Sequence, residues 1–121
     1  DLQIAHREKG RPWDWGKAFD NSAPIAPLLP IAEMPAKMQT LSEGRIWLAV
    51  NGEIRQNASL AEQIWNVSDV IAFCSQSVTL KAGDLIFTGT PSGVSAVSAG
   101  DVLTGGIEGI SDISITLSPR A

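Results

Sequence analysis

The stretch that decides the fold of this chain is IWLAVNGEIRQ, which occupies residues 46–56. Its first five residues, Ile46 to Val50, are apolar and include β-branched and aromatic types, which is typical of a strand. Asn51-Gly52 is the strongest two-residue signal for a hairpin turn, because both residue types tolerate the positive φ that such a turn requires. The sequence therefore predicts an antiparallel β-hairpin whose second strand covers residues 53–56.

Helical signals follow the hairpin. Ser59 and Glu62 have the spacing of a capping box, in which the serine oxygen accepts a backbone N–H and the glutamate side chain reaches back. We expect a helix to begin there. Ser68-Asp69 marks a second helical start or a kink, since apolar residues between Val70 and Val78 recur at helical spacing.

Short strands and turns dominate the remainder of the chain beyond the helical region. Strand-like runs are separated by Gly- and Asp-containing turns, and the last run alternates apolar and polar residues. We expect turns at 80–84, 98–101 and 108–109, and strands at 84–87, 102–104 and 113–117.

The region before the hairpin has weaker signals. Residues 2–9 are polar and compatible with a helix, which Gly10-Arg11-Pro12 would end. Residues 13–20 mix aromatic and polar types without a clear period, which favours a loop or a short irregular strand. Prolines at positions 24, 27 and 30 keep residues 23–29 extended. The whole pattern predicts a β-rich unit of the α/β or α+β class with one or two short helices.

Composition indicates a soluble globular protein with a single domain over residues 1–121, because 44% of the residues are apolar and 18% are charged. The net charge is −4 and the basic residues are scattered, which argues against a nucleic-acid partner. The apolar runs are too short to span a bilayer and no charged-then-apolar leader opens the chain, so we expect no membrane partner and a cytoplasmic location.

Self-sufficient catalytic or metal-binding motifs are missing from the sequence. One histidine, His6, and one cysteine, Cys74, exclude a zinc cluster of His and Cys ligands. The acidic residues stand singly at turns and strand ends, so they do not form a paired set of magnesium ligands. Neither a Gly-x-Ser-x-Gly elbow nor a Walker A loop is present.

The run Thr88-Gly89-Thr90-Pro91-Ser92-Gly93-Val94 suits an exposed binding turn. Pro91 favours an extended Thr90, and the two glycines permit backbone angles or close approaches that a side chain would block. Hydroxyls and backbone N–H groups could then converge on one anion. An ordinary Gly/Pro turn explains the same residues, so both interpretations stand on the local chemistry alone.

Five blocks in order carry a resemblance to a known family: residues 1–3, 11–13, 16–24, 50–56 and 79–94. Together they closely resemble the C-terminal half of the fumarylacetoacetate hydrolase family, over nearly the whole chain. The block at 16–24, GKAFDNSAP, looks most like the acylpyruvase and fumarylpyruvate hydrolase branch.

This resemblance implies a mixed β-roll, a homodimer, and Mg²⁺ or Mn²⁺ chemistry on small 2-oxo acids that carry a β-keto group. It implies that the ammonium of Lys17 faces the substrate oxygens and that Gln3 donates to the substrate. It also implies that Thr90, in the turn with Gly89, binds the substrate carboxylate. Taken without the resemblance, Lys17 is an exposed lysine and Gln3 a polar residue on a helix surface.

The family's metal ligands and its His/Glu dyad belong to segments that do not match this chain. Asp1 aligns with a family aspartate that is not a ligand, and His6 does not fall on the dyad histidine. We therefore expect no metal ligands here, and we expect the chain to be a piece of something longer.

Three functions remain open. The first is a metal-dependent hydrolase that cleaves a C–C bond in acylpyruvates, of which this chain forms the C-terminal part. The second is an oxaloacetate decarboxylase or dienoic oxo-acid isomerase with the same site. The third is a non-catalytic remnant that acts as a folded binding module and could form a dimer.

Overall fold

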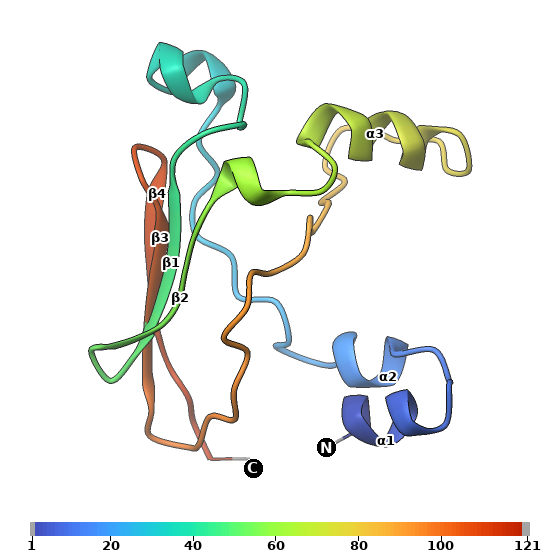
Figure 1. Ribbon diagram of the computed structural model, residues 1–121, viewed down its shortest axis with the longest axis vertical. Coiled ribbons are helices and arrows are strands. Elements are labelled where there is room, and N and C mark those ends of the chain that lie inside the picture. The colour runs from blue at the N-terminus through green and yellow to red at the C-terminus, as the bar shows by residue number, and fades with distance from the viewer. Residues whose placement is uncertain (1, 120–121) are drawn as a thin grey trace.

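A four-stranded antiparallel sheet forms one side of the molecule (Figure 1). The computed structural model describes residues 2–119. The strand order is β2-β1-β3-β4, with every neighbouring pair antiparallel. The strands are β1 (Arg45–Val50), β2 (Glu53–Ser59), β3 (Val102–Ile107) and β4 (Ser111–Thr116). The sheet with its few short helices confirms the expected α+β class.

The predicted hairpin is confirmed at the centre of this sheet. Asn51 has φ 52° and Gly52 has φ 83°, the positive values that a tight hairpin turn needs. The pairing runs from Val50 opposite Glu53 back to Arg45 opposite Ser59, with an irregularity between Leu48 and Ala49. The strands predicted at 102–104 and 113–117 correspond to β3 and β4.

Within residues 2–119, three α-helices and three short 3₁₀ helices lie outside the sheet, joined by long irregular segments (Figure 1). The α-helices are α1 (Leu2–Glu8), α2 (Asp14–Lys17) and α3 (Val67–Ser75), and the 3₁₀ helices are η1 (Ile31–Glu33), η2 (Ala36–Met38) and η3 (Leu60–Glu62). Among residues 2–119, no helix is long and apolar enough to cross a membrane.

The two predicted helix starts can be compared with the observed N-caps. The capping box of Ser59 and Glu62 is formed, but it opens only the single turn η3. Helix α3 begins after Asn66, whose Oδ1 accepts the Asp69 N–H at 2.9 Å. The start expected at Ser68 was therefore two residues late: asparagine is as good an N-cap as serine, and the hydrogen bond from the Asp69 N–H to Asn66 places the cap at Asn66.

Two other expectations are corrected. Residues 13–20 were expected to form a loop or irregular strand, but they contain α2. Residues 84–87 were expected to form a strand, yet in the structure they are irregular and belong to no sheet. A strand needs a ladder partner, and the side chains of Leu85 and Phe87 instead remain 51% and 68% exposed.

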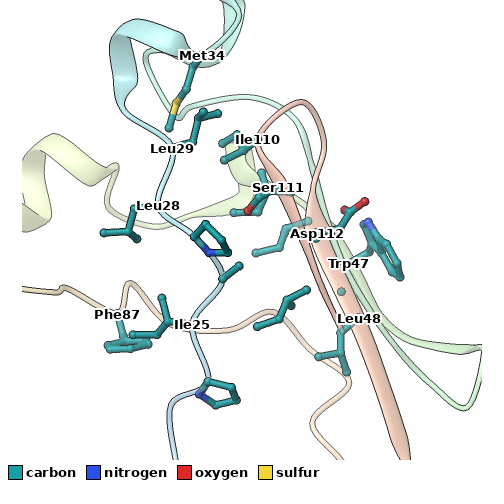
Figure 2. A pocket seen from close by; sticks show the side chains of 18 residues that line it. Ile25, Leu28, Leu29, Met34, Trp47, Leu48, Phe87, Ile110, Ser111 and Asp112 are labelled. Atoms are coloured by element: carbon teal, nitrogen blue, oxygen red, sulfur yellow. The ribbon is translucent and has the colours of Figure 1, made fainter. Parts of the chain in front are cut away.

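The buried core is small for a chain of this length. Its apolar members in the described residues are Met38, Ala49, Val50 and Leu60. Beside it, an open apolar groove of about 440 Å³ lies between the proline-rich segment at 24–29 and one face of the sheet. Figure 2 shows Ile25, Leu28 and Leu29 of that segment on one side and Leu48 and Ile110 on the other. Much apolar surface that a complete domain would bury is therefore open here.

The hairpin turn is tied to the start of β3. The Asn51 N–H donates to the Val102 carbonyl at 2.8 Å, and the Val102 N–H donates to Asn51 Oδ1 at 2.9 Å. Asn51 Nδ2 donates to Asp101 Oδ1 at 2.9 Å. The other oxygen of Asp101 accepts the Ser98 N–H at 2.8 Å. The bond from Ser98 first, and then that from Asn51, lowers the pKa of Asp101 below its ordinary value of 3.8.

Replacing Asp101 by alanine is expected to lower the melting temperature at neutral pH, because two hydrogen bonds that hold the turn are lost. A carboxyl with a lowered pKa in the folded state stabilises the fold above its unfolded pKa, and this contribution disappears as the pH falls through the lowered value. The difference in melting temperature between wild type and Asp101→Ala should therefore shrink as the pH falls below the ordinary value of 3.8 and through the lowered pKa of Asp101. Thermal unfolding followed by circular dichroism at several pH values measures it.

Glu43→Ala is the matched control, because Glu43 is exposed and makes no hydrogen bond or ion pair in the described part of the chain. Equal melting temperatures for the two variants at neutral pH would contradict the assigned role of Asp101.

Candidate functional site

Helices α1 and α2 pack against each other near the N-terminus (Figure 1). Gly16 makes the close approach possible, since a Cβ at that position would lie 3.0 Å from the backbone nitrogen of Gln3 and 3.2 Å from its Cα. Gln3 is half-buried in this contact, and Lys17 is the next residue after Gly16. The helix pair therefore brings Gln3 and Lys17 into one small region.

Lys17 ends α2 and is exposed. Its Nζ lies 5.9 Å from the centre of the Trp13 ring, one helical turn earlier, which is a cation–π arrangement. The aromatic face attracts the ammonium without using its hydrogens. All three N–H groups of the ammonium can then donate to oxygens of a bound molecule.

The segment from Thr88 to Val94 is irregular, with a bend at Ser92, and lies against β2 rather than forming a ladder with it. Gly93 has φ 103°, and a Cβ there would collide with the Arg55 carbonyl oxygen. Gly89 has φ 106°, but a Cβ there would meet open space. Gly93 is thus required by both backbone angle and contact, whereas Gly89 is required by its angle alone.

Two glutamines hold alternate threonines of this segment. Gln56 of β2 donates through Nε2 to Thr90 Oγ1 at 2.8 Å and to the Pro91 carbonyl at 2.7 Å. Gln63, just after η3, donates through Nε2 to Thr88 Oγ1 at 3.3 Å, and its Oε1 is buried without a partner in the described structure. The shorter bonds of Gln56 make it the better satisfied of the two anchors.

The four sequence-predicted residues fall into two groups. Gln3 and Lys17 are joined by the helix pair, while Gly89 and Thr90 are exposed on the segment that Gln56 anchors. In the view of Figure 1 this segment, coloured orange, descends between the sheet and the helix pair. Within residues 2–119, the backbone N–H of Thr90 has no hydrogen-bond partner, so it can donate to a bound anion.

The described side chains do not by themselves fit a divalent metal. In that part of the chain no three His, Cys, Asp or Glu residues gather closely enough to hold an ion. Mg²⁺ and Mn²⁺ require several oxygen ligands, with carboxylates foremost. What the arrangement offers instead is an ammonium, amide groups, a hydroxyl and a free backbone N–H, which are donors suited to an anionic, oxygen-rich molecule. His6 is engaged elsewhere, with Nδ1 2.7 Å from the Pro12 carbonyl oxygen.

The roles of Gln56 and Gln63 at this segment were missed in the sequence analysis. Gln56 is part of the stretch that predicts the hairpin, and nothing local distinguishes it from any other polar strand residue. Its contact with Thr90 spans 34 positions of the sequence. Only the three-dimensional path of the 88–94 segment reveals the pairing.

Comparison with known proteins shows which family this chain matches. The family described as fumarylacetoacetate (FAA) hydrolase C-terminal matches residues 1–118. A fumarylpyruvate hydrolase of a Ralstonia species is 43% identical over 119 residues, which are 98% of this chain and 59% of that protein. The oxaloacetate tautomerase YcgM of Escherichia coli K12 is 42% identical over 104 residues, which are 86% of this chain and 46% of that protein.

Solved structures agree with these matches. The fumarylpyruvate hydrolase of Pseudomonas aeruginosa, crystallised with Mn²⁺ and pyruvate, superposes with a TM-score of 0.89 at 42% identity and covers 99% of this chain and 50% of that one. The maleylpyruvate hydrolase of Sphingobium sp. SYK-6, with manganese and pyruvate, gives a TM-score of 0.76 at 29% identity, covering 84% of this chain and 37% of that one. The chain spans about half the length of the relatives it matches.

The contact between the 88–94 segment and β2 is tested by two alanine substitutions. Gly89→Ala and Gly93→Ala each impose a side chain on a positive φ, which costs about 1 kcal/mol. Gly93→Ala also forces a clash with the Arg55 carbonyl. We expect it to lower the free energy of unfolding by at least about 1 kcal/mol more than Gly89→Ala.

Urea unfolding of the two variants measures this difference. Equal destabilisation would show that the segment does not rest on β2 at Gly93.

Proposed function

The chain belongs to the fumarylacetoacetate hydrolase family, and on that premise we propose that it forms the C-terminal part of the active site of an acylpyruvate hydrolase. The reaction is metal-dependent hydrolysis of a C–C bond in 2,4-dioxo acids of the fumarylpyruvate or acetylpyruvate class. The observation that carries this proposal is the likeness to the Pseudomonas aeruginosa fumarylpyruvate hydrolase that was crystallised with pyruvate. Pyruvate is one of the two products that such a cleavage releases.

The chemistry of this cleavage determines what the site residues must do. Water adds to the distal carbonyl, the bond between that carbonyl carbon and the methylene breaks, and the electron pair passes to the pyruvate fragment as an enolate. A proton then adds to the methylene carbon and gives pyruvate, while the other fragment leaves as a carboxylic acid. Negative charge therefore grows on the substrate oxygens, and donors placed before the reaction stabilise it.

The donors of this chain suit the 2-oxo group and the adjacent carboxylate of such a substrate. We assign the Lys17 ammonium to the oxygen that becomes the enolate, and the Gln3 amide to a neighbouring substrate oxygen. The Thr90 hydroxyl and its backbone N–H, in the turn with Gly89, bind the carboxylate. Mg²⁺ or Mn²⁺ would need ligands from outside the described residues, because these do not gather a carboxylate set.

Isomerisation of oxaloacetate is the second candidate. Relatives of this chain, at 36% to 42% identity, are oxaloacetate tautomerases. Keto–enol exchange of a 2-oxo acid passes through the same kind of enolate, so the same lysine and carboxylate cradle would serve it. Decarboxylation of oxaloacetate, or isomerisation of a dienoic oxo acid, would likewise need the negative charge on the substrate oxygens to be stabilised. Product analysis separates these reactions, since only the hydrolase releases a second carboxylic acid from an acylpyruvate.

The assembly around the site is also a proposal. We take residues 1–121 as a single unit of a cytoplasmic catalytic domain that forms a homodimer. The open groove beside the proline-rich segment and the many exposed large apolar side chains support burial against further polypeptide. The non-catalytic alternative, a folded remnant that keeps the anion-binding turn, predicts neither turnover nor metal binding by calorimetry.

Lys17→Ala tests the catalytic assignment in the protein that carries this chain. With Mn²⁺ and acetylpyruvate or fumarylpyruvate, kcat should fall by about 10²-fold, because a positive charge aimed at the developing enolate is lost. The loss of the enol absorbance of the substrate follows the reaction.

Lys37→Ala serves as the control, since Lys37 is an exposed lysine on η2 and is not one of the assigned site residues. A wild-type kcat for Lys17→Ala would remove Lys17 from the mechanism.

A further inference from the structure

We propose that Gln56 is a positioning residue that fixes Thr90 as a hydrogen-bond donor toward the carboxylate of the substrate. The inference rests on the proposed function, because it concerns the same carboxylate cradle. It assigns to β2 a part in substrate binding, through a side chain that itself need not touch the substrate.

The geometry around the Gln56 amide determines the direction of its hydrogen bonds. Its nitrogen lies 2.8 Å from Thr90 Oγ1 and 2.7 Å from the Pro91 carbonyl oxygen, with the Ser92 carbonyl oxygen more distant at 3.5 Å. A carbonyl oxygen can only accept, so the group that faces Pro91 must be the NH₂ end of the amide. The reversed amide would place two oxygens against each other.

The orientation of the amide then decides the state of the Thr90 hydroxyl. Because the nitrogen of Gln56 can only donate, Thr90 Oγ1 accepts in this contact. The single hydroxyl hydrogen of Thr90 is left for another acceptor. A carboxylate is an acceptor and not a donor, so this is the polarity that a substrate carboxylate requires.

Gln56 is also placed to hold Thr90 still. It is half-buried on a central part of β2, in register with Leu48 of β1, whereas Thr90 belongs to an exposed segment without a ladder of its own. The Gly93 contact with the Arg55 carbonyl anchors the same segment one residue earlier on β2. A strand is a more rigid support than a loop, so the position of the hydroxyl is set by the sheet.

The decisive variant is Gln56→Glu, which keeps the side-chain size and reverses the polarity. When ionised, the new carboxylate accepts the Thr90 hydroxyl hydrogen and repels both the Pro91 carbonyl and the substrate carboxylate. Loss of a hydrogen bond to a charged group should raise KM for the 2-oxo acid by about tenfold or more, with a smaller change in kcat. This rise in KM should become smaller as the pH is lowered, because the introduced carboxyl then takes up a proton. A merely structural defect would not show this pH dependence.

Two further variants serve as comparisons: Gln56→Leu and, outside the site, Gln39→Glu. Gln56→Leu removes the donor without adding charge, so its rise in KM should not depend on pH in this way. Gln39 also donates from Nε2 to a backbone carbonyl, that of Met34 at 3.3 Å, and it lies outside the assigned site. Gln39→Glu should leave KM unchanged. Circular dichroism confirms that each variant is folded.

A double-mutant cycle with Thr90→Val shows whether Gln56 acts through the hydroxyl. Thr90→Val in the Gln56→Leu background should add little to KM, because the interaction has already been lost. If Thr90→Val raises KM and neither Gln56 variant does so, the role of Gln56 is wrong while the carboxylate cradle stands. If Thr90→Val has no effect either, the cradle itself is wrong.

If the protein that carries this chain shows no turnover, calorimetry with pyruvate as the probe measures Kd in place of KM. The variants are then expected to change Kd as described for KM. Absence of pyruvate binding in the wild type would overturn the inference together with the cradle.

Discussion

The attachment of the 88–94 segment to β2 is the interaction on which the candidate site depends. This segment has no ladder of its own, so its position follows from the Gln56 amide bonds and from the close approach of Gly93 to the Arg55 carbonyl. β2 is in turn fixed by the Asn51-Gly52 turn to β1, and β1 pairs with β3. The proposed carboxylate cradle is thereby carried by an exposed segment but positioned by a hydrogen-bonded sheet.

The sequence predicted the hairpin because everything that specifies it is local. The apolar run, the two residues that accept positive φ and the returning strand are contiguous. The capping box of Ser59 and Glu62 was likewise predicted from local sequence, although it opens only the short 3₁₀ helix η3. In contrast, the helix at 14–17 was missed because its aromatic and polar residues follow no helical period, and its packing depends on Gly16 meeting Gln3 of another element.

Contacts between distant residues set the limit of prediction for the site. Lys17, Gln3 and Thr90 could be named from the resemblance to the family, but their spatial partners could not. The link between Gln56 and Thr90 requires the 88–94 segment to return alongside β2, which no local pattern encodes. The strand expected at 84–87 was wrong for a related reason: a strand-like pattern gives no information about whether a ladder partner is available.

The central claim is that this chain supplies the carboxylate-binding and charge-stabilising donors of a 2-oxo acid site, while the metal ligands come from outside its described residues. A crystal structure of the protein that carries this chain, soaked with pyruvate and Mn²⁺, tests it most directly. The account predicts the pyruvate carboxylate within hydrogen-bond distance of the Thr90 hydroxyl and backbone N–H, with Lys17 Nζ directed at the oxo group. Pyruvate bound with its carboxylate away from Thr90 would contradict it.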